Sequence, residues 1–170
     1  MEFLELAKKR YSCRQLSNRK VEQDKIEKIL QAAQVAPTAV NKQPFHIWVM
    51  ESNEAKEVVS QSTNCTFNAS VFFVVGAKKE EAWIREYDQR NFGDVDASIV
   101  ATHMMLEIED LGLSTTWVGH FDPEPLKKAY STMKDYDLIA LFPTGYAETE
   151  AVPSPRHTVR KDIDAIVDRM

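Results

Sequence analysis

Apolar positions recur along the chain with two different spacings, which predict helices and strands in turn. Segments with an apolar residue every three or four positions have the spacing of amphipathic helices. Short and nearly continuous apolar runs are typical of buried strands. The expected helices cover residues 3–10, 21–36, 53–59, 95–111 and 162–170, with a further one opening at 122–125, and the expected strands cover residues 47–50, 71–75, 114–118 and 138–142.

Residues that favour helix ends stand at these boundaries. Pro37 cannot continue the second helix. Asn53 and Asp122 have side chains suited to cap a helix, and Pro123 fits the first turn after Asp122. Gly112 suits the left-handed conformation that often ends a long helix. The terminating residues therefore agree with the apolar periodicity.

The strand segments indicate the architecture. Residues 71–75 are apolar at every position, so this strand is expected to be buried on both faces. Pro-Thr-Gly at 143–145 is expected to end the last strand, and residues 80–92 follow neither period. Alternating helices and strands in 170 residues predict one domain, residues 1–170, with helices packed on a central sheet. The periodicity leaves the strand order open.

Composition narrows the class of protein. The chain has 21 Lys and Arg against 26 Asp and Glu, a formal net charge of −5, so we expect no nucleic-acid partner. Locally concentrated basic residues would still suit an anionic ligand. The chain has no apolar run of about 20 residues and no leader-like start, so we expect a cytoplasmic protein without a membrane partner. Its two cysteines are then free thiols, and its histidines lack metal-ligand spacing.

Two arginines flank a serine just after the first expected helix. If this stretch is extended, Arg10, Ser12 and Arg14 point to the same side. Two guanidinium groups and a hydroxyl together make a receptor for an oxyanion. The alternative is an ordinary helix end, where basic side chains lie close to the last carbonyl groups. These residues alone leave both interpretations open.

A second polar cluster lies between two prolines, Pro37 and Pro44. Within it Asn41 and Gln43 each offer a donor and an acceptor, which suits the edge of a planar heterocycle. The alternative is a plain connector between a helix and a strand, which needs turn-forming residues in any case.

Taken in order, five motifs resemble the FMN-dependent nitroreductase family. They are Arg-x-Ser-x-Arg at 10–14, Pro-Thr-x-x-Asn-x-Gln-Pro at 37–44, the Asp96 helix ending in Gly-Leu-Ser-Thr-Thr-Trp-Val-Gly at 112–119, Phe-Pro-Thr-Gly-Tyr at 142–146 and Pro-Ser-Pro-Arg at 153–156. The resemblance covers nearly the whole chain. It implies a three-layer α+β fold, with helices on both faces of a central mixed sheet, that forms an obligate homodimer.

The resemblance also implies a role for each matching position. The FMN phosphate and nearby ribityl oxygens would be held by Arg10, Ser12 and Arg156, while Arg14 would approach the pyrimidine side of the flavin ring. The second subunit would contribute Pro37, Thr38, Ala39 and Asn41, with Gln43 close by. The backbone of Trp117, Val118 and Gly119 would pass along the ring near N5.

The sequence departs from the family pattern in three places. Many members have a lysine where this chain has Ser154, so Arg160 or His157 is a candidate replacement. Either Asn64 or Asn68 is a candidate for the polar residue that many members place at the flavin edge. The region of residues 77–96 is short, which implies a more open substrate pocket than in longer members.

The activity implied is that of an FMN-dependent NAD(P)H oxidoreductase. Hydride would pass from NADH or NADPH through N5 of FMN to a small-molecule electron acceptor, such as a nitroaromatic or a quinone, in a ping-pong cycle. The protein would then need no acid or base of its own. Two alternatives stay open, a non-catalytic FMN-storing or redox-sensing protein and a specialised flavin oxidoreductase of the same fold.

Overall fold

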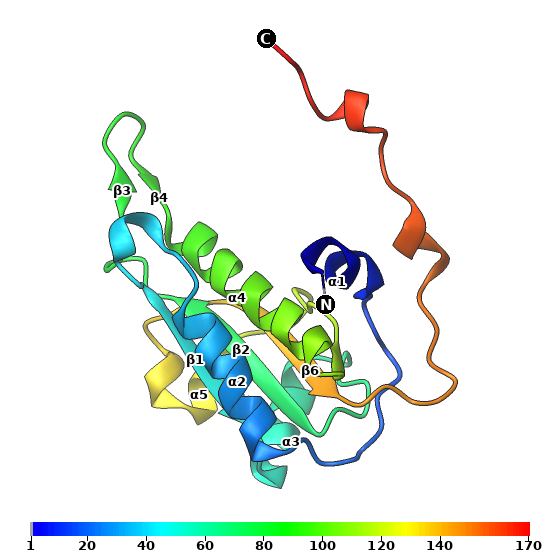
Figure 1. Cartoon of the computed structure of the whole chain (residues 1–170). Helices are drawn as coiled ribbons and strands as arrows, with labels where there is room; N and C mark the ends of the chain where they lie inside the picture. Colours follow the sequence, from blue (N-terminus) through cyan, green and yellow to red (C-terminus); the bar gives the residue numbers. More distant parts are fainter. Residues whose placement is uncertain (1) are drawn as a thin grey trace.

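A four-stranded sheet runs through the middle of the molecule, with helices on both of its faces (Figure 1). The computed structural model describes residues 2–170, and Met1 lies outside the described residues. The strands are β1 (Phe45–Met50), β2 (Val71–Ala77), β5 (Ser114–Thr115) and β6 (Asp137–Gly145), in the order β1-β2-β6-β5 with antiparallel neighbours. A separate hairpin of β3 (Ile84–Arg85) and β4 (Arg90–Asn91) fills the region that had no assignment from the sequence.

The helices agree with the expected segments over most of the chain. They are α1 (Phe3–Lys9), α2 (Gln23–Gln34), α3 (Asn53–Ser62), α4 (Gly93–Asp110) and α5 (Glu124–Ala129). Four short 3₁₀ turns also occur, namely η1 (Ala39–Asn41), η2 (Ser131–Met133), η3 (Pro155–Thr158) and η4 (Ile163–Ala165). None of the helices in residues 2–170 is both long and apolar enough to cross a membrane.

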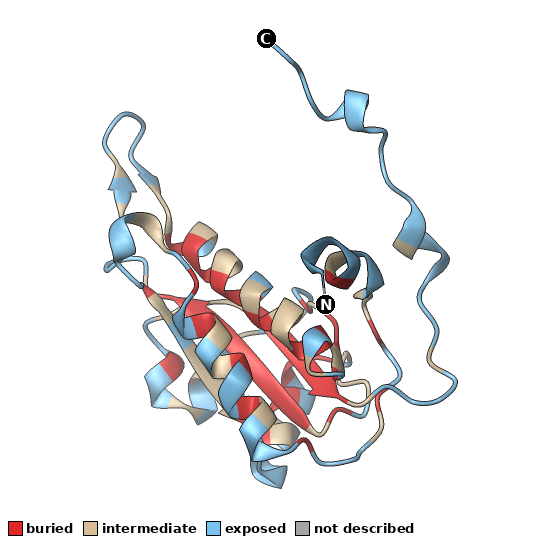
Figure 2. Cartoon of the chain, viewed as in Figure 1, coloured by how far each residue is buried: buried red, intermediate tan, exposed pale blue. Residues whose placement is uncertain are grey.

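Two apolar cores, one on each face of the sheet, confirm the three-layer α+β fold. On one face Phe73 and Val75 of β2 pack with buried residues of α2 and α4. On the other face Phe72 and Val74 pack with buried residues of α3 and α5. Every residue of β2 is buried, as expected from its apolar sequence (Figure 2). A fully buried aromatic or aliphatic side chain contributes about 1.5–3 kcal/mol, so β2 is a main source of stability.

The parallel component of the expected mixed sheet is an isolated bridge between Ser12 and Thr115. Through this bridge the segment that follows α1 lies beside β5. The Cys13 N–H donates to the Thr115 carbonyl over 3.0 Å. The sheet therefore fixes the first polar cluster in extended form.

The ends of α4 and α5 follow the predicted pattern. Gly112 has a φ of 71°, and the Leu113 N–H donates to the Ile108 carbonyl over 3.0 Å, which closes the C-terminus of α4. The Asp122 carboxylate accepts a bond from the Glu124 N–H at 3.0 Å, at the start of α5. The expected cap at Asn53 is wrong by one residue, because the Ser52 hydroxyl accepts the Ala55 N–H at 3.1 Å.

Two strand boundaries differ from the expectation. β5 ends at Thr115 instead of 118, although Val118 still forms a bridge with Leu141. β6 does not end before Pro143 but continues to Gly145. Leu141 bonds with Val118 on the β5 side, so Pro143, two residues on, turns its nitrogen to the same side. The neighbouring strand is interrupted there, so the missing N–H of Pro143 leaves no broken pair.

The C-terminal segment is extended rather than helical, so the helix expected at 162–170 is wrong. Only the single turn η4 forms there, and the segment projects from the body with exposed side chains (Figures 1 and 2). A nine-residue helix is marginal without a surface to pack on. Within this chain the segment has no such surface.

Candidate functional site

The end of α1 and the bridge to β5 orient the first polar cluster. The Arg10 N–H donates to the Leu6 carbonyl over 2.9 Å, so Arg10 ends the helix. The chain then runs extended, and the Cys13 side chain is buried in the core with 1% exposure. Side chains alternate along an extended segment, so Ser12 and Arg14 face away from the core. Arg10 therefore ends a helix, as one interpretation of the sequence expects. It also lines a cavity with Ser12 and Arg14, as the oxyanion-receptor interpretation expects.

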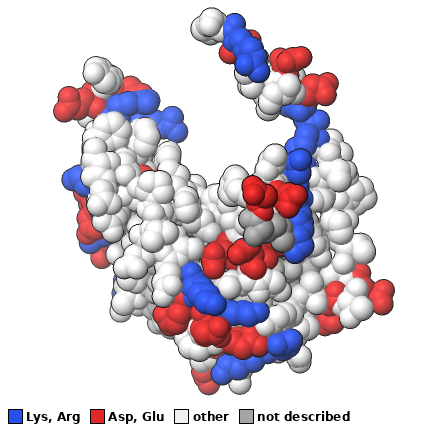
Figure 3. All heavy atoms as spheres, in the orientation of Figure 1, with Lys and Arg blue, Asp and Glu red and all other residues white. Residues whose placement is uncertain are grey.

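This cavity has a volume of about 400 Å³ and is strongly basic. The residues that line it are Arg10, Tyr11, Ser12, Arg14, Ser154, Arg156, His157 and Arg160. The structure therefore brings the Arg-x-Ser-x-Arg motif and the closing arginine together across some 140 residues of sequence. Figure 3 shows basic side chains gathered along the C-terminal segment.

Ser154 shapes the turn that carries Arg156. Its hydroxyl accepts the Arg156 N–H at 3.3 Å, and its carbonyl accepts the His157 N–H at 2.8 Å. The 3₁₀ turn η3 follows from these two bonds. Ser154 is thus a capping residue, and Arg160 and His157 lie on the same cavity.

The cavity concentrates positive charge that no carboxylate neutralises directly. Within residues 2–170, none of its four arginines forms an ion pair. Burial lowers the pKa of the Arg10 guanidinium, the carboxylate of Glu109 works against this, and the nearby Arg160 adds to it. A bound anion would relieve this repulsion, so the cavity favours an anionic ligand.

Tyr11 lies between the cavity and the core. Burial and then a hydrogen bond with the Cys13 thiol raise the pKa of Tyr11 to about 12. Its phenol therefore stays protonated at neutral pH, so that Tyr11 adds no negative charge to the cavity. Its ring meets His157 edge-on, with the ring centroids 6.2 Å apart.

The second polar cluster forms a loop with an unusual backbone. Val40, Asn41 and Gln43 have φ values of 45°, 56° and 51°, in the left-handed region that non-glycine residues seldom occupy. Inside the loop the Gln43 N–H donates to the Thr38 hydroxyl over 3.0 Å. Outside it, the Ala39 N–H donates to the Asp96 carboxylate of α4 over 2.8 Å.

The two polar clusters lie at opposite ends of α4 within one chain. Asp96 in the first turn bonds the loop, while Glu109 in the last turn pairs with Lys9 at 3.4 Å. Thirteen residues of helix separate these two contacts by about 20 Å. The structure of one chain therefore does not bring the loop to the basic cavity.

The third predicted segment follows β5 along the sheet. Trp117 packs edge-on against Phe142 with ring centroids 5.3 Å apart, and Val118 exchanges backbone bonds of 3.0 Å with Leu141. Gly119 lines a second cavity of about 470 Å³. Its other lining residues are Ser60, Gln61, Ser62, Thr63, Asn64, Cys65, His120, Phe121 and Asp122.

This second cavity separates the two asparagine candidates. The Asn68 amide donates to the Leu16 carbonyl over 3.2 Å, so Asn68 supports the chain fold. Asn64 is exposed and lines the cavity beside Gly119. Asn68 is exposed as well but does not line this cavity.

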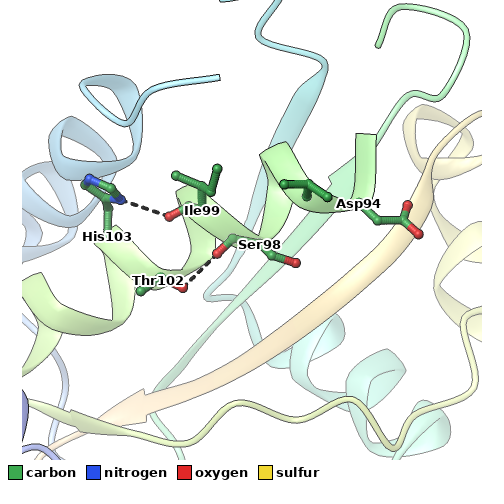
Figure 4. A pocket seen from close by; sticks show the side chains of 6 residues that line it. Asp94, Ser98, Ile99, Thr102 and His103 are labelled. Carbon is green, nitrogen blue, oxygen red and sulfur yellow. Dashed lines mark hydrogen bonds between the residues drawn. The ribbon is translucent and has the colours of Figure 1, made fainter. Parts of the chain in front are cut away.

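A further hollow follows the outer side of α4. Its volume is about 490 Å³, and Figure 4 shows its lining side chains projecting from successive turns of this helix. A cavity of about 780 Å³ between α1, α2 and α4 adjoins it, and Thr102 and His103 line both. The middle of this surface is formed by Ser98, Ile99, Thr102 and His103, and the charged residues Asp94, Lys28, Glu107 and Asp110 lie toward its ends. The sequence analysis did not single out this surface.

Asp96 has a contact that the sequence motifs did not predict. The motifs place Asp96 only at the start of a helix, whereas in the structure its side chain bonds the loop of residues 37–44. The available signal was its spacing, because Asp96, Val100, Met104 and Ile108 recur every four residues on the core face. A carboxylate on an apolar face needs a buried partner.

The chain is similar to known proteins over most of its length. The sequence model described as the nitroreductase family matches residues 7–68 and 62–146. A nitroreductase family protein from Clostridium difficile 630 is 37% identical, with a TM-score of 0.90 over 99% of this chain and 98% of that one. A protein of Archaeoglobus fulgidus named "Putative NADH dehydrogenase/NAD(P)H nitroreductase" is 31% identical over 88% of this chain and 87% of its own length.

A more distant structure has the same fold. It comes from Exiguobacterium sibiricum 255-15, is in complex with FMN, and is 20% identical with a TM-score of 0.86 over 100% of this chain and 98% of that one. Since the family match spans most of the residues that build the sheet and both cores, the chain belongs to the nitroreductase family.

Proposed function

We propose that the protein is an FMN-dependent NAD(P)H oxidoreductase that works as a homodimer in the cytoplasm. The observation that carries the proposal is the basic cavity, in which four arginines of a nitroreductase family member face one space without a carboxylate partner in the described chain. The free state of both cysteines suits a reducing compartment.

The donors of the cavity fit a phosphate group. A phosphate monoester carries nearly two negative charges at neutral pH, and guanidinium groups bind it with paired charge-assisted bonds. Arg10, Ser12 and Arg156 would hold it, and Arg160 and His157 would supply what Ser154 cannot. Each hydrogen bond to a charged group contributes about 1.5–3 kcal/mol.

The neighbouring residues fit the rest of the cofactor. Arg14 would face the pyrimidine side of the ring, where a positive charge stabilises negative charge at N1 and O2. A Cβ at Gly119 would meet no atom within 4 Å, so open space adjoins the backbone that would pass the ring. Asn64 lies on the same cavity and would bond the ring edge.

When bound, FMN would supply the redox chemistry, taking hydride at N5 from NADH or NADPH and passing electrons to a nitroaromatic, a quinone or another small acceptor in a ping-pong cycle. The chain itself would bind FMN and orient the nicotinamide and the acceptor against it. Solvent can exchange the protons, because the cavities are open to it. Nothing in the chain then has to act as a general acid or base.

A second copy of the chain would complete the site. One chain holds its loop at the first turn of α4, about 20 Å along the helix from Glu109 in the last turn. The residues of this loop would therefore serve the partner's flavin, and they are Pro37, Thr38, Ala39, Asn41 and Gln43. The middle of the outer side of α4, around Ser98, Ile99 and Thr102, is a surface that a second copy would cover. The exposed apolar side chains of the C-terminal segment also suit an assembly, and they are Val152, Val159, Ile163, Ile166 and Val167.

Steady-state kinetics test the proposed reaction. NADH or NADPH oxidation is measured at several fixed quinone concentrations with the FMN-loaded protein. We expect turnover with parallel lines in double-reciprocal plots, as a ping-pong cycle requires. FMN-loaded protein that oxidises neither nicotinamide would contradict the enzyme and favour a flavin-storing protein.

A further inference from the structure

Asp96 is a buried carboxylate in the core face of α4. Its exposure is 1%, and the residues one and two turns further on, Val100 and Met104, belong to the apolar core beneath the helix. Burying a charged group in such surroundings is costly unless it is bonded. Core packing therefore does not explain why a carboxylate stands at this position.

The partner of Asp96 lies outside its own helix. Its Oδ1 accepts the Ala39 N–H at 2.8 Å, while its Oδ2 has no hydrogen-bond partner in residues 2–170. Asp96 stands in the first turn of α4, where an acidic side chain interacts favourably with the helix dipole. The hydrogen bond that Asp96 accepts therefore holds the loop and does not cap α4.

The strained backbone of the loop needs a contact such as the Asp96 bond to keep its conformation. Val40, Asn41 and Gln43 all have positive φ values, and Val40 is a β-branched residue for which that conformation is rare. The bond from Gln43 to Thr38 closes the loop on itself but ties it to no other element. Strained backbone persists only where the surrounding structure holds it.

Two bonds connect the loop to the body at its two ends. At one end the Ala39 N–H donates to Asp96, and at the other the Lys78 N–H donates to the Pro44 carbonyl over 2.8 Å. Asn41 and Gln43 lie between these points. Loss of the Asp96 bond would leave this stretch without its contact to α4.

We propose that Asp96 is a positioning residue, whose buried carboxylate fixes the loop of residues 37–44 so that its amide groups meet the flavin of the other subunit. This inference rests on the proposed function. Asp96 itself would not touch the cofactor. Its effect on the flavin passes through the Ala39 N–H and the backbone of the loop.

Two substitutions of Asp96 and one control test the inference. Asp96→Ala removes the acceptor, whereas Asp96→Asn keeps a carbonyl oxygen for the Ala39 N–H. Asp24→Ala is the control, because Asp24 is an exposed acid in the first turn of α2. Each dimer is titrated with FMN, the visible spectrum of the bound flavin is recorded, and hydrogen exchange is followed at residues 37–44.

We expect Asp96→Ala to weaken FMN binding by about tenfold, to shift the spectrum of the bound flavin and to speed exchange at Ala39. Asp96→Asn should stay within about twofold of the unmodified protein, as should Asp24→Ala. A merely structural role would lower the melting temperature without moving the flavin spectrum, and that outcome would overturn the proposal. Equal losses in the Asn and Ala variants would overturn it as well.

The two proposals fail in different ways. If the unmodified protein binds no FMN, the proposed function fails. If the unmodified protein binds FMN and Asp96→Ala leaves affinity, spectrum and exchange unchanged, only the inference about Asp96 fails. Hydrogen exchange at the Ala39 N–H is measured without turnover, so its rate tests the bond between Asp96 and the loop directly.

Discussion

Arg156 and Arg14 belong to the same basic cavity but lie in different surroundings. Arg156 is carried by a short turn that Ser154 caps, and Arg14 is exposed at the end of an extended segment. Arg156 is exposed as well, so water screens both charges, and the two residues are expected to differ in which part of the cofactor they affect.

Arg156→Ala is predicted to weaken FMN binding. Loss of one hydrogen-bonded charge corresponds to a dissociation constant raised by about tenfold to a hundredfold. Fluorescence titration with FMN measures this change. Arg169→Ala, at the far end of the same segment, should bind as the unmodified protein does. An unchanged dissociation constant for Arg156→Ala would remove this residue from the phosphate site.

Arg14→Ala is predicted to lower the two-electron potential of the bound flavin while the dimer stays intact. Screening limits the effect to about 1.4 kcal/mol, which corresponds to about 30 mV. Potentiometric titration of the bound flavin against a reference dye gives the value. A potential equal to that of the unmodified protein would exclude Arg14 from the N1 and O2 side of the ring.

At the scale of elements, a polar cluster ties the end of β6 to the start of α2. The Tyr146 hydroxyl donates to the Glu22 carboxylate, Lys25 donates to the Tyr146 oxygen over 3.1 Å, and the Arg19 guanidinium lies 3.9 Å above the Tyr146 ring centroid. The hydrogen bond from Tyr146, a backbone bond and the bond from Arg19 lower the pKa of Glu22 to about 2.

This lowered pKa makes stability depend on pH. A carboxylate with a lowered folded-state pKa stabilises the fold above its unfolded value of 4.5, and the contribution is lost as the pH falls from there through about 2. Tyr146→Phe is predicted to reduce the loss of stability between pH 5 and pH 2.5. Urea unfolding at both pH values measures it. A pH slope identical to that of the unmodified protein would contradict the role of Tyr146.

Sequence periodicity predicts the elements whose burial follows from their own run of apolar residues. β2 is apolar throughout and buried throughout, and the end of α4 follows from Gly112. The errors arise where tertiary context decides. Pro143 stays in a strand because its neighbour is interrupted, and residues 162–170 stay extended because this chain offers them nothing to pack on.

The candidate site likewise has residues that the sequence predicts and a contact that it does not predict. Motif order in the sequence singles out Arg10, Ser12, Arg14 and Arg156, which the fold brings to one cavity. The role of Asp96 depends on a contact between α4 and a loop 57 positions earlier, which no local pattern encodes. The roles of the motif residues toward FMN stay predictions.

At the scale of the whole molecule, the proposed dimer depends on the outer side of α4 around Thr102. Thr102 is exposed there, and its hydroxyl donates to the Ser98 carbonyl over 2.8 Å (Figure 4). A charge at this position would be buried in a dimer and solvated in a monomer. Its effect therefore reports on assembly more than on folding.

Thr102→Glu is predicted to shift the protein from dimer to monomer at micromolar concentration and to lower its FMN content. Light scattering gives the mass and absorbance gives the flavin. The matched control is Ser131→Glu, since Ser131 is also an exposed hydroxyl residue and lines none of the cavities described above. A Thr102→Glu dimer as stable as that of the control would rule out this face as the interface.

The central claim is that this chain holds FMN. The most direct measurement is the visible spectrum of the purified protein, followed by chromatography of the chromophore released on denaturation. We predict a flavin spectrum and FMN as the released compound, or the same spectrum after added FMN has bound. A colourless protein that also fails to bind added FMN would contradict the cofactor, the reductase and the role of the basic cavity together.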